Sequence, residues 1–283
     1  MIIDTHAHLD FPEFAGEIDA LIERAASVGV TRIVTIGTNV EGSRRAVALA
    51  EQYPGVYAAI GIHPNSAMEA EPDAIEALRE LAKSPRVVAI GETGLDYYRL
   101  PSSRLASNKI EALANEEPAN ITAAIEDGAV KSAQSMLFQQ QLDLAVELGL
   151  NVVIHQRGPA WEDTLDLLQP YQGKLRAVFH CFGGTPEQAE EVIQLGHLVS
   201  FTGIVTFKNA QTVQETAASI APGTFMLETD APYLAPIPFR GKRCEPAYTR
   251  LTAEKVAALR GDPLDEIARI TSATAEEFFR FNR

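Results

Sequence analysis

The sequence has few of the residues on which several common classes of protein depend. Only two cysteines occur among its 283 residues, Cys181 and Cys244, and their wide separation excludes a CxxC metal site and a disulfide framework. No apolar run approaches the ~20 residues that a transmembrane helix needs, and the N-terminus lacks the basic and apolar regions of a secretory signal. We therefore expect a cytoplasmic protein with reduced thiols and no membrane partner.

Positive charge is also scarce. Lys and Arg number 24 against 38 Asp and Glu, which gives a formal net charge of −14. Proteins that coat nucleic acid draw most of their affinity from clustered Lys and Arg, so the composition argues against that class. A nucleic-acid substrate would have to be held locally, by metal ions and a small basic patch.

What the chain does contain is a regular alternation of two patterns. Short apolar, β-branched runs recur at 2–5, 31–37, 56–62, 87–91, 151–155, 176–180, 197–203 and 224–229. Their continuous hydrophobicity is typical of strands buried on both faces of a parallel sheet. Stretches with helical periodicity lie between them, for example at 16–28, 41–52, 74–83, 137–149 and 186–195.

Eight strands alternating with helices predict an α/β fold, a (β/α)8 or TIM barrel. Such a barrel typically needs about 250 residues, so we expect residues 1–283 to form a single domain. The alternative architecture is an open doubly wound sheet. It is disfavoured because no GxGxxG sequence follows the first apolar run.

One interval between two predicted strands is too long for this alternation of strands and helices. About sixty residues separate Gly91 from Asn151, and residues 101–132 have few bulky apolar side chains. We interpret 101–132 as an insertion after strand 4, partly helical at 110–114 and 121–126. Because it would leave the C-terminal face of the barrel, it is either a lid that selects substrate or a solvated decoration, and the second is favoured.

Metal-ligating residue types follow the predicted strands. His6 and His8 come directly after the first run, and alternate side chains on a strand share a face, so the pair suits a divalent ion. The residues that follow later runs are His63, Glu92, His155, His180 and Asp230. Each alone has an ordinary interpretation, such as a packed histidine or a helix cap. Together, four histidines and two carboxylates at one rim are the ligands that two divalent ions need.

Seven motifs in order along the chain resemble those of TatD-type metal-dependent deoxyribonucleases in the amidohydrolase superfamily. They are DTHAH (4–8), GIHP (61–64), GETGLDYY (91–98), HQR (155–157), HCFGG (180–184), ETDAPYLAP (228–236) and RGKRCEPA (240–247). The resemblance implies a barrel with a binuclear site and 3′–5′ exonuclease or related phosphodiesterase activity on DNA. It places one ion among His6, His8, Glu92 and Asp230, and the other among Glu92, His155 and His180.

The chain departs from this family pattern in three places. The insertion at 101–132 is one. The second is the segment QRGPA after His155, where a shorter HxRxA run is usual, which leaves the role of Arg157 open. In the third, Cys244 stands where Asn is common and Phe239 where His is common. None of these changes touches an expected ligand.

The expected chemistry assigns roles to the other polar residues. Glu92 would bridge the ions, since a carboxylate can offer one oxygen to each, and Asp230 would take the proton of the attacking water. Asp4 would orient an imidazole. We expect substrate-binding roles for His63, Arg157, Arg240, Lys242 and Arg243, although the last three also fit a solvated basic turn. Tyr97, Tyr98 and Tyr233 can stack on an unpaired base or pack at the rim, and packing is favoured.

Three hypotheses for function follow. The first is a 3′–5′ exodeoxyribonuclease or phosphodiesterase that uses two ions of Mg, Mn or Zn on DNA or another phosphodiester, as a monomer or a weak oligomer. The second is an amidohydrolase-type esterase, lactonase or deacylase acting on a carbonyl. Many such enzymes bridge their metals with a carboxylated Lys, so the presence of Glu92 favours the first. The third, an inactive metal-binding scaffold, is disfavoured because every expected ligand is present.

Overall fold

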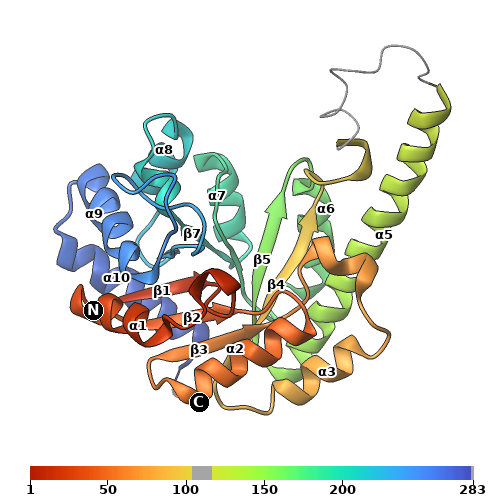
Figure 1. The fold of residues 1–283 in the computed structure, drawn as a ribbon. Coiled ribbons are helices and arrows are strands. Elements are labelled where there is room, and N and C mark those ends of the chain that lie inside the picture. Colours follow the sequence, from red (N-terminus) through yellow and green to blue (C-terminus); the bar gives the residue numbers. More distant parts are fainter. Residues whose placement is uncertain (104–116, 282–283) are drawn as a thin grey trace.

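A computed structural model describes residues 1–103 and 117–281 (Figure 1). Eight parallel strands form one sheet, and their order in the sheet is their order in the chain. The strands are β1 (Ile2–Ala7), β2 (Val30–Ile36), β3 (Val56–Ile60), β4 (Val87–Asp96), β5 (Asn151–Arg157), β6 (Ala177–Phe179), β7 (Leu198–Phe201) and β8 (Phe225–Leu227).

The first and last strands lie side by side, and they close the sheet into a barrel. Ala7, the last residue of β1, forms a parallel bridge with Ala231, which follows β8. The amide of His8 donates to the carbonyl of Ala231 at 2.8 Å, and the amide of Asp230 donates to the carbonyl of His6 at 2.8 Å. The predicted (β/α)8 barrel is confirmed, and the alternative of an open doubly wound sheet is wrong.

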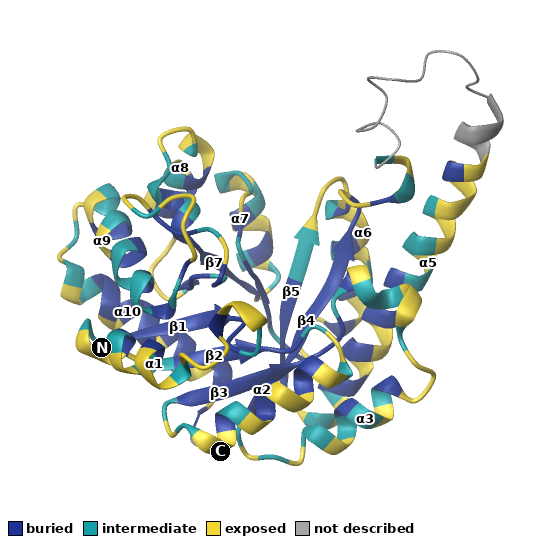
Figure 2. Cartoon of the chain, viewed as in Figure 1, coloured by how far each residue is buried: buried dark blue, intermediate teal, exposed yellow. Residues whose placement is uncertain are grey.

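Helices cover the outside of the barrel, and Figure 2 shows buried strands enclosed by helices whose outer faces are exposed. In α3, for example, Ala74 and Leu78 are one turn apart and both buried. In α7, Thr185 and Gln188 form a capping box that begins the helix. The helices are α1 (Ile18–Ser27), α2 (Val40–Gln52), α3 (Ala74–Leu81), α5 (Glu117–Leu148), α6 (Trp161–Leu168), α7 (Pro186–Gln194), α8 (Gln211–Ser219), α9 (Thr249–Arg260) and α10 (Leu264–Phe279).

Strand β4 is longer than the apolar run at 87–91 that predicted it. Residues 93–96 continue the strand because Ile154–Arg157 of β5 offer them pairing partners. The register shifts between Ile90 and Thr93, so the ladder is irregular at Glu92. Such an irregularity re-aims side chains. Glu92 therefore lies within β4, not after it as the sequence predicted.

Helix α5 contains both the helix expected near 137–149 and the segment 121–126 expected to be helical. Figure 1 shows that α5 extends past the C-terminal ends of β4 and β5. Its C-terminal part packs on the barrel through buried side chains such as Phe138 and Leu142, whereas Ile125 is 69% exposed. The other helical segment expected, 110–114, lies outside the described residues.

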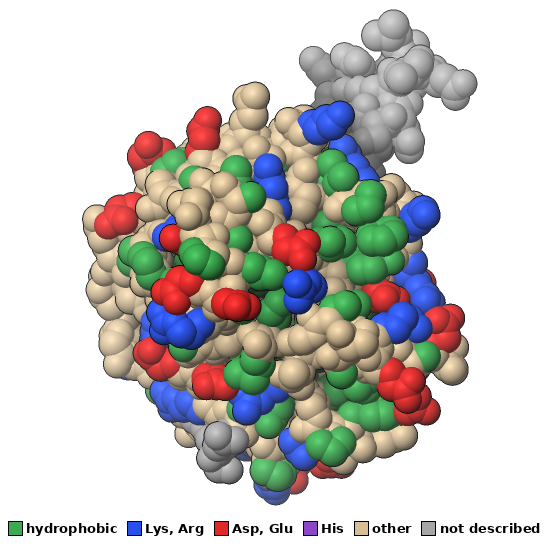
Figure 3. Space-filling model, turned by 90° about the vertical axis from the view of Figure 1, so that its left-hand side faces the viewer, with side chains coloured by type: hydrophobic (Ala, Val, Ile, Leu, Met, Phe, Trp, Pro, Cys, Tyr) green, Lys and Arg blue, Asp and Glu red, His purple; other side chains and the backbone are tan. Residues whose placement is uncertain are grey.

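The surface agrees with the acidic composition. Figure 3 shows a face on which Lys and Arg side chains are interspersed with Asp and Glu instead of forming one continuous basic patch. Within the described ranges, none of the helices combines the length and apolar character needed to cross a bilayer.

Candidate metal centre

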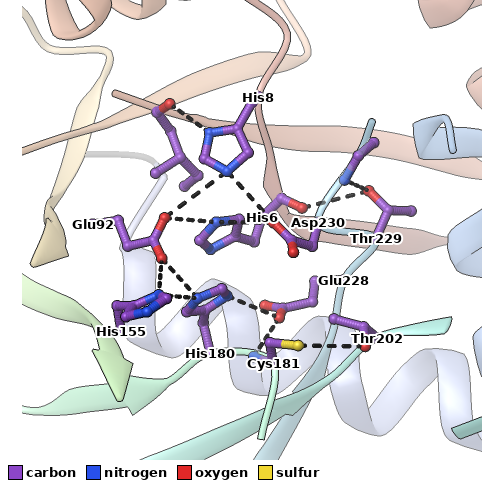
Figure 4. Close-up of polar contacts among 12 residues, drawn as sticks. His6, His8, Glu92, His155, His180, Cys181, Thr202, Glu228, Thr229 and Asp230 are labelled. Carbon is purple, nitrogen blue, oxygen red and sulfur yellow. Dashed lines mark hydrogen bonds and ion pairs between the residues drawn. The ribbon is translucent and has the colours of Figure 1, made fainter. Parts of the chain in front are cut away.

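The six predicted metal ligands converge at the C-terminal ends of the strands, where Figure 4 shows them facing one another. They come from β1, β4, β5 and the segments that follow β1, β6 and β8. Within the described part of the chain, three sets of side chains bring their ligand atoms within 4.8 Å of one another. These sets are His6, Glu92 and His180; His6, His8 and Asp230; and His63, Glu92 and His155.

Glu92 lies between two groups of imidazoles and turns one carboxylate oxygen toward each. Oε2 is 3.4 Å from Nε2 of His6 and 3.9 Å from Nε2 of His8. Oε1 is 2.7 Å from Nδ1 of His155 and 2.8 Å from Nε2 of His180. A carboxylate with this division of contacts can offer one oxygen to each of two ions.

His8 has a ring orientation that suits a ligand. Its Nδ1 lies 3.1 Å from the carbonyl of Ile36, which places the proton of a neutral ring on Nδ1. The lone pair of Nε2 then faces Oδ1 of Asp230 at 3.4 Å. A hydrogen bond from the ring nitrogen that faces away from an ion fixes the tautomer of a metal-binding histidine.

Glu228 does the same for His180, and the sequence analysis missed it. Its Oε1 lies 3.4 Å from Nδ1 of His180. The carboxylate is itself held by two donors, the amide of Cys181 and the hydroxyl of Ser200, both at 2.6 Å. Glu228 stands two residues before Asp230 in the motif at 228–236, and that position was the available indication.

Asp96 is a second residue that the analysis missed. Its Oδ2 lies 3.4 Å from Nε2 of His155, on the opposite side of the ring from Glu92. Asn65 donates to the same oxygen at 3.1 Å. Although burial opposes the change, the contacts with His155 and Asn65 lower the pKa of Asp96 to about 2. Asp96 is therefore ionised at neutral pH and orients His155.

His63 joins the second group, at a position where it can also meet a substrate. Its Nε2 lies 3.6 Å from Oε1 of Glu92 and 3.3 Å from Nδ1 of His155. The amide of Asn65 donates to Nδ1 of His63 at 3.0 Å, so the neutral ring carries its proton on Nε2. Burial lowers the pKa of His63 to about 3, which keeps the ring neutral. A neutral Nε2–H is a hydrogen-bond donor, not a ligand, in this tautomer.

The electrostatics of the cluster fit bound cations. Burial and the neighbouring His180 lower the pKa of His6. Burial would raise the pKa of Glu92, but the surrounding histidines outweigh it and hold that pKa well below its ordinary value. Burial likewise opposes ionisation of Asp230, yet His8 and His6 lower its pKa. Both carboxylates are therefore charged, at the centre of a ring of buried imidazoles.

Orphaned polar atoms test whether metal ions fit here. Buried polar atoms are normally hydrogen-bonded. In His6, both ring nitrogens are buried and without a hydrogen-bond partner among the described residues. The Nε2 atom of His6 lies within 3.7 Å of oxygens from both Glu92 and Asp230. Imidazole nitrogens and carboxylate oxygens in this arrangement match the ligand set of a borderline divalent ion.

Asp4 supports the backbone instead of an imidazole, which corrects the sequence prediction. Its carboxylate oxygens accept hydrogen bonds from the hydroxyl of Thr229 at 2.7 Å and from the amide of Thr229 at 2.9 Å. They also accept one from the amide of His6 at 3.3 Å. Burial raises the pKa of Asp4 to about 8. These contacts tie β1 to the segment that carries Asp230, whose φ of 59° is unusual for a residue other than glycine.

The predicted phosphate-binding residues divide into two kinds. Arg243 forms an ion pair with Glu17 at 2.7 Å, so this side chain is occupied. Arg157, Arg240 and Lys242 are exposed and lie over the rings of Tyr98, Phe207 and Phe239, respectively.

Arg99 belongs with the exposed cations, and the sequence analysis missed it. Its amide donates to Asp96, and its guanidinium has no ion pair within residues 1–103 and 117–281. It follows the motif at 91–98 directly, and a search for cations beside that motif would have found it.

The three tyrosines next to the motifs also differ. Tyr97 is 4% exposed and donates its hydroxyl to Asp163 at 2.7 Å, so it packs at the rim as the sequence predicted. Tyr98 and Tyr233 are 60% and 50% exposed. Each ring also contacts a neighbour, with Arg157 over Tyr98 and Phe11 against Tyr233, so packing at the rim stays a prediction for these two.

Comparison with known proteins identifies relatives over the whole chain. A family model described as TatD related DNase matches residues 3–280. A protein of Bacillus subtilis named "Uncharacterized metal-dependent hydrolase YabD" is 36% identical over 283 residues, covering 100% of both chains. A "3'-5' ssDNA/RNA exonuclease TatD" of Erwinia tasmaniensis is 34% identical, covering 98% of this chain and 99% of that protein. The crystal structure of the TatD homologue YjjV of Escherichia coli K12 superposes with a TM-score of 0.82 at 30% identity, covering 99% and 98% of the two chains.

Proposed function

Since this chain belongs to the TatD-related DNase family and is a metal-dependent hydrolase, we propose that it removes nucleotides from the 3′ end of single-stranded nucleic acid with two divalent ions. Two relatives that span nearly all of this chain carry the name of a 3′–5′ exonuclease acting on single-stranded DNA and RNA. The proposal transfers that activity to the present site. Its residues provide the ligands, a base and a hydrogen-bond donor.

The proposal rests on one observation: the two oxygens of the Glu92 carboxylate face two different pairs of histidines. Oε2 faces His6 and His8, while Oε1 faces His155 and His180. One ion would be held by His6, His8, Glu92 and Asp230, and the other by Glu92, His155 and His180. When bound, two such ions generate a hydroxide nucleophile and stabilise charge on the oxygens of a phosphodiester. The ions would be Mg, Mn or Zn: the imidazoles of this set suit Zn, and its carboxylates suit Mg and Mn.

Asp230 is the carboxylate placed to receive a proton. Its side chain is 15% exposed, whereas that of Glu92 is 4% exposed, so water reaches Asp230 more easily. His8 and His6 hold its pKa below the ordinary value despite burial, so the carboxylate is ionised at neutral pH. Glu92 instead remains enclosed by imidazoles, as a bridging ligand would be.

The substrate's phosphates would be held by neutral and cationic donors around this cluster. His63 presents Nε2–H beside Glu92, and such a donor can bind a phosphate oxygen. Four exposed cations lie at or after strand ends: Arg99 follows β4, Arg157 ends β5, and Arg240 and Lys242 follow β8. A few local cations suit a chain with a net charge of −14, because a broad basic surface is lacking on the face drawn in Figure 3.

The test uses chelated protein reloaded with Mg²⁺, Mn²⁺ or Zn²⁺. The substrate is a 5′-labelled single strand with a free 3′ end or with phosphorothioate linkages at that end. We expect a ladder that shortens from the 3′ end and stops at the block. A panel of esters and lactones tests the alternative function, hydrolysis at a carbonyl group by an amidohydrolase-type enzyme. Ester turnover without phosphodiester cleavage by any of the three metal forms would overturn the proposal.

A matched pair of variants tests the bridging role. Glu92→Gln keeps the shape of the side chain but removes its charge, so the bound metal and the activity should both fall. We expect kcat/KM to drop by at least about 100-fold, since bound ions supply several kcal/mol of transition-state stabilisation. Glu80→Gln, at an exposed glutamate paired with Lys83, should leave both unchanged. A Glu92→Gln protein that still binds two ions and turns over would refute the bridge.

A further inference from the structure

Two aromatic side chains, Phe11 and Tyr233, form a row from the candidate metal centre to the surface, on the side of β1 and β8. The ring of Phe11 stacks on His8, with 4.6 Å between centroids and 18° between planes. Tyr233 meets Phe11 edge to face at 6.2 Å. Both residues are fixed to the segments that carry candidate ligands: the amide of Phe11 donates to the carbonyl of His8 and that of Tyr233 to the carbonyl of Asp230, at 3.2 and 2.9 Å.

Packing does not account for Tyr233. A tyrosine that serves the core buries its ring and satisfies its hydroxyl, as Tyr97 does. Tyr233 is 50% exposed, and its hydroxyl has no hydrogen bond to any residue that the structure describes. The ring of Tyr233 is therefore open to solvent, beside the partly buried Phe11 and next to the residues proposed to hold an ion.

The surface around Tyr233 suits a nucleobase. The ring is uncharged and half-exposed, and an aromatic face of this kind can stack on an unpaired base of any sequence.

We propose that Phe11 and Tyr233 form a stacking subsite for one unpaired nucleobase beside the phosphodiester that is cleaved. The inference depends on the proposed function and adds to it the element of the substrate that is recognised. A base within a duplex has both faces covered by its neighbours, so only a single-stranded or frayed end could use this surface. A stacked base typically contributes about 1–3 kcal/mol of binding.

Oligonucleotides with and without a base test the subsite. Two sets of 5′-labelled strands carry either a normal nucleotide or an abasic tetrahydrofuran residue at one of the two 3′-terminal positions. For the wild type we expect kcat/KM to fall about 5-fold to 150-fold when the base at one of these positions is missing. Tyr233→Leu should reduce that ratio to near one, mainly through KM, and Tyr233→Phe should retain it. Ile237→Ala, an exposed apolar residue on the same loop, is the matched control and should leave the ratio unchanged.

A binding measurement separates this inference from the proposed function. A single strand ending in 2-aminopurine is titrated into chelated protein, where no cleavage occurs, and quenching of its fluorescence reports stacking. Quenching by the wild type that is lost in Tyr233→Leu would support the subsite even if no metal form cleaved DNA, in which case only the proposed function would fall. Equal quenching by both proteins, or equal cleavage of normal and abasic strands by the wild type, would overturn the subsite alone. Bound metal and melting temperature of each variant confirm that the fold is retained.

Discussion

The carboxylate of Glu228 lies behind the imidazole of His180, with 3.4 Å between Oε1 and Nδ1. The other ring nitrogen of His180 faces Glu92 at 2.8 Å. A carboxylate placed in this way holds the proton on Nδ1 and aims the Nε2 lone pair at the position of an ion. Glu228 is 1% exposed, so its role depends on contacts inside the barrel and not on solvent.

Replacing Glu228 should weaken metal binding without removing a ligand. We expect Glu228→Gln to lower metal affinity about 10-fold to 100-fold, the usual cost of losing such a partner of a ligating histidine. Competition with a chelator, followed by elemental analysis of the protein, measures the change. The control is Glu215→Gln on the exposed face of α8, which should have wild-type affinity. Unchanged affinity in Glu228→Gln would show that His180 is oriented by other contacts or is not a ligand.

The close approach of β4 to β5 leads to a second prediction. Gly94 has a φ of 134°, and a Cβ built there would lie 2.1 Å from the carbonyl oxygen of His155. Gly94→Ala must therefore push β5 and its histidine away from Glu92. We expect a loss of about 2–5 kcal/mol in the free energy of unfolding, from backbone strain and overpacking together.

Urea denaturation measures this loss, and α5 offers the matched control. At Gly128, a built Cβ meets nothing within 4 Å. Gly128→Ala should stabilise the protein by up to about 1 kcal/mol, because alanine is the better helix former. Equal stabilities for the two variants would mean that β5 can shift at little cost.

The sequence predicted the barrel and the convergence of the candidate ligands because both depend on local order. Strands buried on both faces read as continuous apolar runs, and in a barrel of parallel strands the residue after each run lies at one rim. His8, His180 and Asp230 could therefore be placed together without knowing any contact. Their ring orientations and partners could not, since those come from packing between distant segments.

Other features depended on contacts that the sequence does not mark. The continuation of β4 through Asp96 requires β5 as a partner, because residues 93–96 pair with Ile154–Arg157. Arg243 looked like a phosphate-binding residue, but its partner Glu17 lies 226 positions earlier in the chain. Glu228 and Asp96 are ordinary carboxylates until the fold brings an imidazole to each.

Replacing an arginine that has an ion-pair partner and replacing one that lacks it should affect substrate binding differently. Arg240 has no carboxylate partner in the described part of the chain and lies over Phe207, whereas Arg243 is paired with Glu17. We expect Arg240→Ala to raise KM for single-stranded DNA and to reduce the slope of log affinity against log salt by about 1. Arg243→Ala should leave that slope unchanged, and a reduced slope in Arg243→Ala alone would reverse the assignment.

Metal removal should destabilise the protein. An ion that binds only the folded state at about 100 times its dissociation constant stabilises that state by about 2.7 kcal/mol. For a chain of this size we expect the melting temperature to rise by about 4–5 °C for each ion that binds when chelated protein is reloaded. Differential scanning calorimetry with and without Mn²⁺ measures the rise. Glu92→Gln should abolish it, and a full rise in that variant would place the ion elsewhere.

His197 predicts a dependence of stability on pH that is independent of the metal centre. It lies at the start of β7, at the opposite end of the barrel from the candidate ligands, and its Nδ1 accepts from the amide of Ala177 at 3.2 Å. Burial, together with the charge of Arg176, lowers its pKa to about 4 from an ordinary value of 6.5. The folded state therefore binds fewer protons than the unfolded chain between these pH values.

Stability from this group is fully present above pH 6.5 and is lost as the pH falls from 6.5 toward 4, because the unfolded chain takes up the proton first. A difference of 2.5 pH units corresponds to about 3 kcal/mol in the free energy of unfolding. His197→Asn keeps an acceptor for Ala177 but cannot titrate, so its stability should fall less steeply over this interval. Urea denaturation of both proteins at half-unit steps, after chelation, gives the difference directly, and parallel curves would mean that His197 is protonated in the folded state.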